Sequence, residues 1–236
     1  MAIARNPVGR LYRLLDAGRQ VPNASLRVLD VWGKVLLAED DDAGKLHRLV
    51  RLNRLWVQSM SLLRNQEDLD RELYLRGLDD MRVAFTLEHS FNTWGNVKKY
   101  LSSDPMLRLQ FCSDFMAKKP SLDPEVEESE LQEILSLIEE ASSEVREREI
   151  DAELRLVLTG MLSDMRNAVQ DYYILGRQGM AEGVQNAIGA VVIQRSAWQA
   201  NGSAIPAKLR QALLALCGKL SIDVLKLGEK FGSLLE

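Results

Sequence analysis

Apolar residues recur every three or four positions through most of the chain, which is the spacing of one face of an α-helix. The second half shows this most clearly, because one apolar stripe runs over 131–145 and another over 154–175. Their members are Leu131, Ile134, Ile138, Ala141 and Val145, then Leu154, Val157, Met161, Met165, Ala168, Tyr172 and Leu175. The step from Val145 to Ile150 shifts the phase between the stripes. We therefore predict either one long helix over 124–175 with a stutter, or a helical hairpin that turns near 146–151.

The same spacing predicts helices in the rest of the chain. One is expected after Pro22 and another after the acidic run 39–42, where carboxylates stabilise a helix N-terminus through its dipole. The composition agrees: 39 Leu and 20 Ala against 3 Thr is typical of helical proteins. These features predict an all-α protein, a multi-helix bundle of about eight helices. Further helices are expected over 67–88, 97–101, 105–116, 180–200 and 206–235.

The clearest interruption of the helical pattern lies between Lys118 and Pro124. Lysines suit the last turn of a helix, and Pro120 cannot continue it. Asp123 followed by Pro124 is typical of an N-cap and the first helical position. We therefore predict two helical subdomains, 1–119 and 120–236.

Net charge differs in sign between these two predicted subdomains. Residues 1–119 contain 19 Lys and Arg and 15 Asp and Glu, a net charge of +4. Residues 120–236 contain 11 and 19 respectively, a net charge of −8. Opposite signs favour docking of the two halves or head-to-tail association between copies. The alternative interpretation is that the acidic residues form a solvated helix face.

Several kinds of site have no support in the sequence. Cys112 and Cys217 lack a second Cys or His at ligand spacing, so they predict neither a metal site nor a disulfide framework. The first residues lack the continuous apolar stretch of a signal peptide, and no apolar run approaches the ~20 residues that cross a bilayer. We expect a cytoplasmic protein with no membrane span, no metal and no small-molecule cofactor.

Arg82 and His89 are the first candidates for catalysis. Six residues separate them, and this spacing resembles the Arg-x(4–6)-His element of HEPN-domain ribonucleases, which are small α-helical proteins. The resemblance implies that the two residues act together on an RNA phosphodiester, usually in a dimer. A His can move a proton near neutral pH, and a guanidinium stabilises phosphate charge. The match covers eight residues, and Val83 stands where the family usually has a polar residue. On a helix, Arg82 and His89 would share a face.

The second candidate site is a basic surface. Lys45, Arg48, Arg51 and Arg54 lie within one predicted helix, where they could contact nucleic-acid phosphates. The alternative is that their aliphatic stems cover a leucine-rich core face while the charged ends reach solvent.

A glycine series in the second half is the third candidate. It lacks the Lys-Ser/Thr of a phosphate-binding loop, so we interpret it as structural. Gly176 is expected to end a helix in the left-handed conformation, and Gly183 to let another helix approach closely. The series consists of Gly176, Gly179, Gly183 and Gly189.

Helical stripes without a catalytic constellation favour a non-enzymatic interaction protein or regulatory subunit. We expect it to bind a protein partner or further copies of itself through helix faces. The first alternative is a HEPN-like ribonuclease, or a degenerate relative, that uses Arg82 and His89. The second alternative is a helical protein that binds nucleic acid through the basic surface.

Overall fold

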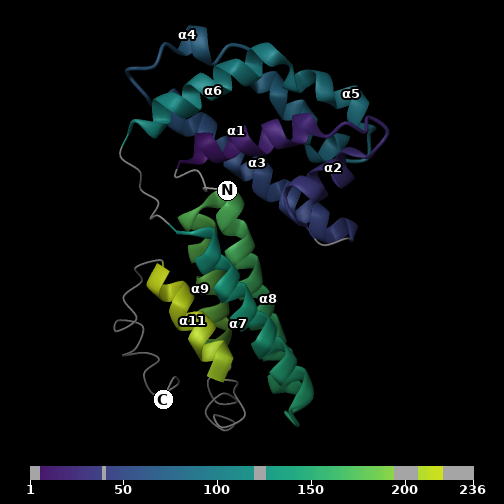
Figure 1. The fold of residues 1–236 in the computed structure, drawn as a ribbon, viewed down its shortest axis with the longest axis vertical. Helices are drawn as coiled ribbons and strands as arrows, with labels where there is room; N and C mark the ends of the chain where they lie inside the picture. The colour runs from purple at the N-terminus through teal and green to yellow at the C-terminus, as the bar shows by residue number, and fades with distance from the viewer. Residues whose placement is uncertain (1–5, 39–40, 120–125, 194–206, 220–236) are drawn as a thin grey trace. The chain divides into compact units, whose positions relative to one another are not determined.

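The computed structural model describes residues 6–38, 41–119, 126–193 and 207–219 (Figure 1). These residues form ten α-helices and three short 3-10 helices and contain no β-strand. The prediction of an all-α fold is confirmed, with ten helices in the described residues where about eight were expected. No helix in these ranges combines the length and the apolar composition that crossing a bilayer would require.

The chain forms two compact units, and each is described by itself. The N-terminal unit comprises Ala4–Asp123 together with Ile174–Gly176. The C-terminal unit comprises Met1–Ile3, Pro124–Tyr173 and Arg177–Glu236. Residues 120–125, which hold most of the interruption on which the predicted boundary rests, lie outside the described residues.

The N-terminal unit begins with a helix that the apolar spacing did not predict. The side chain of Asn6 caps α1 by accepting a hydrogen bond from the Gly9 N–H at 2.7 Å, and Pro7 occupies the first helical turn. Val8 and Leu15 are fully buried on its inner face. The α-helices of this unit are α1 Pro7–Gln20, α2 Val28–Val35, α3 Asp42–Arg64, α4 Arg71–Tyr74, α5 Trp94–Lys98 and α6 Ser103–Ala117, and its 3-10 helices are η1 Asp79–Phe85, η2 Leu87–His89 and η3 Lys99–Leu101.

Aromatic side chains form the centre of this unit. The Trp32 ring meets Phe85 and Trp94 edge to face, at centroid distances of 6.1 and 5.7 Å, and Trp56 lies 5.5 Å from Phe85. The Trp32 indole N–H also donates a 2.7 Å hydrogen bond to the carbonyl of Ala84. This interlocked cluster therefore joins α2, α3, α5 and η1.

The helix expected over 67–88 is not formed, and this prediction was wrong. Asp70 caps only the four residues of α4, and Gly77 then adopts the left-handed conformation, with φ +77°. η1 follows, and Thr86 is extended at ψ 151°. Burial of Met81 and Phe85 holds the segment in this irregular path, because tertiary packing outweighs local helix propensity.

Within the described residues, the C-terminal unit contains four long helices (Figure 1). Residues 128–175 form two helices separated by Arg148–Asp151, so of the two arrangements the sequence left open the structure adopts the hairpin. Leu, Ile, Met and Ala from all four helices share one buried core. The expected continuations over 194–200 and 220–235 lie outside the described residues. The helices are α7 Glu128–Glu147, α8 Ala152–Leu175, α9 Arg177–Ile193 and α11 Ala207–Lys219.

Two glycines of the series act as predicted. Gly176 follows α8 with φ +66°, which is the left-handed conformation expected at a helix end. A Cβ at Gly183 would lie 2.5 Å from the Cβ of Ala168 and 2.8 Å from its Cα. The absence of a side chain at Gly183 therefore lets α9 approach the backbone of α8 closely, and the structural interpretation of both positions is confirmed.

Candidate functional site

The structure places Arg82 and His89 on separate short helices. Arg82 is exposed on η1, and His89 is half-buried at the end of η2. The common α-helical face expected for them does not exist, because Thr86 between them is extended. The Asn92 side-chain nitrogen lies 3.0 Å from His89 Nδ1. An amide nitrogen only donates, so in the neutral imidazole this contact leaves the proton on Nε2.

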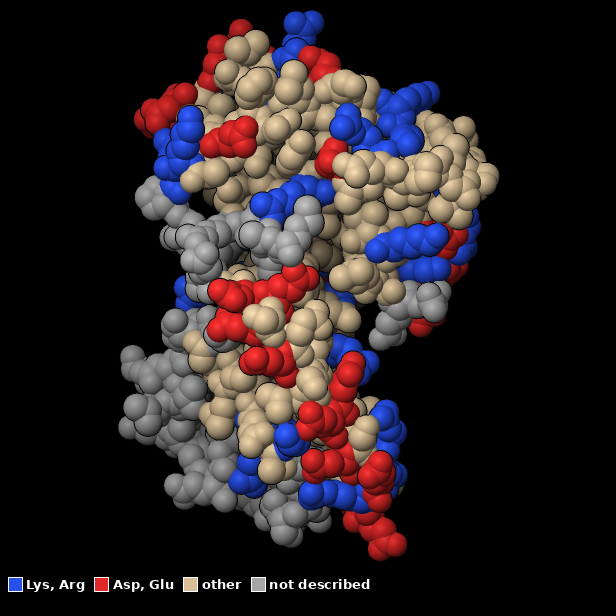
Figure 2. Space-filling model, viewed as in Figure 1, with Lys and Arg blue, Asp and Glu red and all other residues tan. Residues whose placement is uncertain are grey.

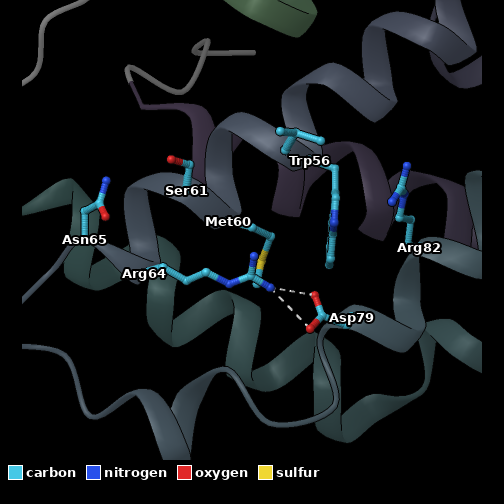
Figure 3. A pocket seen from close by; sticks show the side chains of 8 residues that line it. Trp56, Met60, Ser61, Arg64, Asn65, Asp79 and Arg82 are labelled. Carbon is cyan, nitrogen blue, oxygen red and sulfur yellow. Dashed lines mark hydrogen bonds and ion pairs between the residues drawn. The ribbon is translucent and has the colours of Figure 1, made fainter.

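No hydrogen bond or ion pair joins Arg82 to His89 within the described ranges. Instead, Arg82 lines an open pocket of about 490 Å³, and His89 is not among the lining residues (Figure 3). Catalysis by this pair stays a prediction. The pocket is lined by Trp56, Val57, Met60, Ser61, Arg64, Asn65, Asp79 and Arg82.

The pocket is framed by the C-terminal half of α3 and by η1, which are tied together at two points. At one end, the Asn53 side-chain N–H donates to the Phe85 carbonyl at 2.7 Å. At the other, Arg64 donates to both carboxylate oxygens of Asp79, at 3.1 and 3.3 Å. The ring contact between Trp56 and Phe85 fixes the wall between these ties. Contacts at both ends of the pocket therefore fix the distance between α3 and η1.

The basic residues proposed for nucleic-acid binding all lie on α3. The Lys45 side chain is 16% exposed, and Arg48 is 4% exposed. Arg51 and Arg54 are half-buried, and each makes an interaction of its own in the structure. Because all four are partly or wholly buried, the area that they offer to a phosphate backbone is small. Nucleic-acid binding through them stays a prediction.

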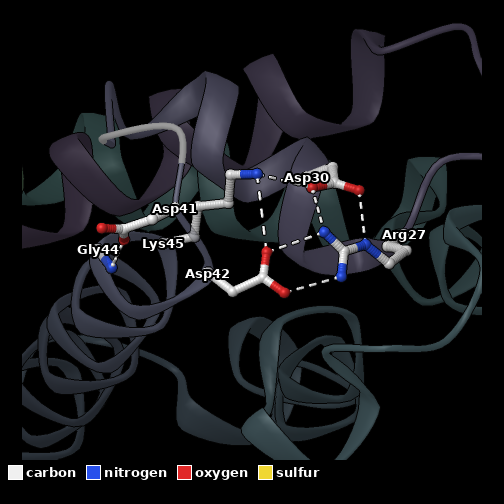
Figure 4. Close-up of polar contacts among 6 residues, drawn as sticks. All are labelled: Arg27, Asp30, Asp41, Asp42, Gly44 and Lys45. Atoms are coloured by element: carbon white, nitrogen blue, oxygen red, sulfur yellow. Dashed lines mark hydrogen bonds and ion pairs between the residues drawn. The ribbon is translucent and has the colours of Figure 1, made fainter.

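Lys45 belongs to an ionic cluster that joins the N-terminal ends of α2 and α3 (Figure 4). Arg27 binds both oxygens of Asp30, at 2.8 and 2.9 Å, and both oxygens of Asp42, at 2.9 Å. Lys45 Nζ lies 2.9 Å from Asp30. The hydrogen bonds from Arg27, aided by Lys45, lower the pKa of Asp30 from 3.8 to about 2 against the opposing effect of burial. The cluster is thus internally neutralised, and we interpret it as a structural tie.

An exposed apolar surface that the sequence pattern did not predict lies on α4 and α6. Leu73, Leu107 and Phe111 are 52%, 51% and 51% exposed. The ring of Tyr74 meets Phe111 at 6.3 Å, and Arg108 donates a hydrogen bond to the Leu73 carbonyl, so the two helices present one surface. We call these four apolar residues, Leu73, Tyr74, Leu107 and Phe111, the α4–α6 patch. Its signal in the sequence is the four-residue step from Leu107 to Phe111, on the face opposite the buried Leu109 and Cys112.

Metal and thiol chemistry find no site in the described part of the chain. No group of three or more His, Cys, Asp or Glu residues there could hold a metal ion. Burial raises the pKa of Cys112 to about 11 and also raises the pKa of Cys217. Both are therefore protonated thiols at neutral pH and behave as small apolar residues.

Comparison with known proteins returned no match, whether to a protein-family model, to a curated protein or to a solved structure.

Proposed function

We propose that this protein is a non-enzymatic helical interaction protein that self-associates through the α4–α6 patch. The observation that carries this proposal is the exposure of three large apolar side chains, each about half exposed, on one surface. Single exposed apolar residues are ordinary, but a contiguous group marks an interaction surface. Here the Tyr74–Phe111 ring contact and the hydrogen bond from Arg108 to Leu73 hold the group together.

The charges along α6 favour a second copy of this chain as the partner. Asp104 and Lys118 are exposed and lie seven residues before and after Phe111. If two α6 helices pair antiparallel about Phe111, Asp104 of each copy lies opposite Lys118 of the other. A two-fold contact of this kind is self-complementary and closes at the dimer.

The test is the molar mass in solution, measured by analytical ultracentrifugation from about 1 to about 500 μM. We expect a monomer–dimer equilibrium, because a surface that pairs with itself is filled at two copies. Leu107→Glu is expected to give a monomer throughout, since it places a charge in the apolar contact. The matched control is Leu156→Glu on α8, where a residue 74% exposed lies outside the patch and the dimer should persist.

A charge reversal tests the geometry more sharply. Lys118→Glu alone should weaken the dimer, because the new carboxylate of each copy would face Asp104 of the other copy. Adding Asp104→Lys should restore the dimer in part, because this second change also removes the Asp104–Arg108 ion pair within α6. A wild-type chain that stays monomeric over the whole range, or whose mass grows beyond a dimer, would contradict the proposal.

A further inference from the structure

The pocket between α3 and η1 has the features of a ligand site, and it is distinct from the α4–α6 patch. Its volume of about 490 Å³ falls in the range of small-molecule sites, roughly 300–1,000 Å³. Trp56 and Met60, each 3% exposed, form its floor, while Val57 is 57% exposed at the rim. Figure 3 shows the Trp56 ring standing between Met60 and Arg82. A ligand would therefore meet an apolar floor beside a cation.

The two arginines of the pocket differ in their partners. Arg64 is engaged by Asp79, at 3.1 and 3.3 Å. Arg82 is exposed and, within the described ranges, makes no hydrogen bond or ion pair. Its guanidinium donors are thus available for a planar anion, which guanidinium groups bind through paired hydrogen bonds.

The charges that line the pocket select the charge of the ligand. Arg64, Arg82 and Asp79 together carry one net positive charge. A singly charged anion neutralises this net positive charge, whereas a phosphate dianion would leave excess negative charge beside the Asp79 carboxylate. The site is therefore matched to a carboxylate rather than to a phosphate monoester.

We propose that this pocket binds a monocarboxylic acid with a flat apolar body, with the carboxylate on Arg82 and the body against Val57, Trp56 and Met60. The two ties between α3 and η1, Asn53 to Phe85 and Arg64 to Asp79, hold the site open before the ligand arrives. A pocket formed in advance loses little conformational freedom on binding. The role of Arg82 in this pocket is to bind the ligand, not to catalyse a reaction.

The test is calorimetric titration of the full chain with 2-naphthoate and with its neutral counterpart, 2-naphthamide. We expect the acid to bind about tenfold more tightly than the amide, because only the acid makes charge-assisted hydrogen bonds with Arg82. Arg82→Gln should weaken binding of the acid about tenfold and leave the amide unchanged. The matched control is Arg76→Gln, an exposed arginine that does not line the pocket.

A second variant distinguishes the effect of removing the Arg82 charge from the effect of filling the pocket. Ser61 is exposed and lines the pocket, so Ser61→Phe should fill it and weaken binding of both probes. Equal affinity for acid and amide, unchanged binding by Arg82→Gln, or no binding of the acid up to about 10 mM would overturn the proposal. Leu107→Glu should bind naphthoate as the wild type does, so failure of the dimer and failure of the pocket are distinguishable.

Discussion

The two units are built by different means from a similar supply of apolar residues. In the C-terminal unit, four helices of 13 to 24 residues bury stripes of Leu, Ile, Met and Ala. In the N-terminal unit, several elements have three to eight residues and pack around interlocked aromatic rings. Side chains there bond to backbone carbonyls far away in the sequence, as Trp32 does to Ala84 and Lys98 to Val21.

The contrast between the units shows where a local sequence pattern is enough to build a structure. A long helix satisfies its own backbone, so its apolar stripe needs only a facing stripe. A short 3-10 segment leaves much of its backbone unpaired, so distant side chains must hold it in place. The surface of the C-terminal unit is also distinctive, because Asp and Glu side chains gather on it (Figure 2). Its first described helix, α7, has acidic residues on its exposed face.

Removing the central ring of the N-terminal unit should have the largest effect. Trp32 is fully buried, contacts two other rings and donates to the Ala84 carbonyl. Trp32→Ala is expected to lower the free energy of unfolding by about 3–5 kcal/mol, because it leaves a cavity. Urea unfolding followed by circular dichroism measures this loss. Phe91→Ala is the matched control, since Phe91 is 62% exposed, and it should change stability by less than about 0.5 kcal/mol. Equal effects of the two substitutions would show that the aromatic cluster does not stabilise the unit.

Two glycines of the C-terminal unit should respond to the same substitution in opposite directions. Gly183→Ala places a methyl group 2.5 Å from the Cβ of Ala168, so α8 and α9 must separate, at about 1–3 kcal/mol. Gly160 lies in α8, is exposed and has no neighbouring atom within 4 Å of an added Cβ. Gly160→Ala should therefore stabilise the protein by up to about 1 kcal/mol through helix propensity. The measurement is the urea midpoint of each variant, and a shift of the same sign in both would contradict the close approach at Gly183.

Acid should weaken the ionic tie between α2 and α3, with a smaller effect than the loss of the Trp32 ring. The folded-state pKa of Asp30 lies at about 2, below its ordinary 3.8. The ionised Asp30 carboxylate therefore stabilises the folded state above about pH 4, and this stabilisation is lost as the pH falls towards 2. With partial exposure taken into account, we expect a loss of about 1–2 kcal/mol.

The measurement is the free energy of unfolding from pH 5 to pH 2 for the wild type and Asp30→Asn. The variant lacks this carboxylate, so its pH dependence should be shallower than that of the wild type over the same window. Parallel curves would show that Asp30 does not contribute in the folded state.

The sequence located only part of the candidate sites. Arg82 was selected for its spacing from His89, but the structure brings it to Trp56 and Asp79 instead. Trp56, Met60 and Asp79 were not among the site residues that the sequence predicted. The α4–α6 patch was missed because α6 is apolar on both its buried and its exposed face. No local pattern distinguishes these faces, because burial depends on which other helices cover them.

The all-α class and most of the long helices could be predicted from the sequence, because apolar spacing near 3.6 residues acts within one segment. The roles of Gly176 and Gly183 could also be predicted, because they follow from the lack of a side chain. The irregular path from Asp70 to His89, and with it the pocket on α3, could not be predicted in this way. That path depends on contacts between residues tens of positions apart, such as Asn53 with Phe85, and the apolar spacing within one segment does not predict such contacts.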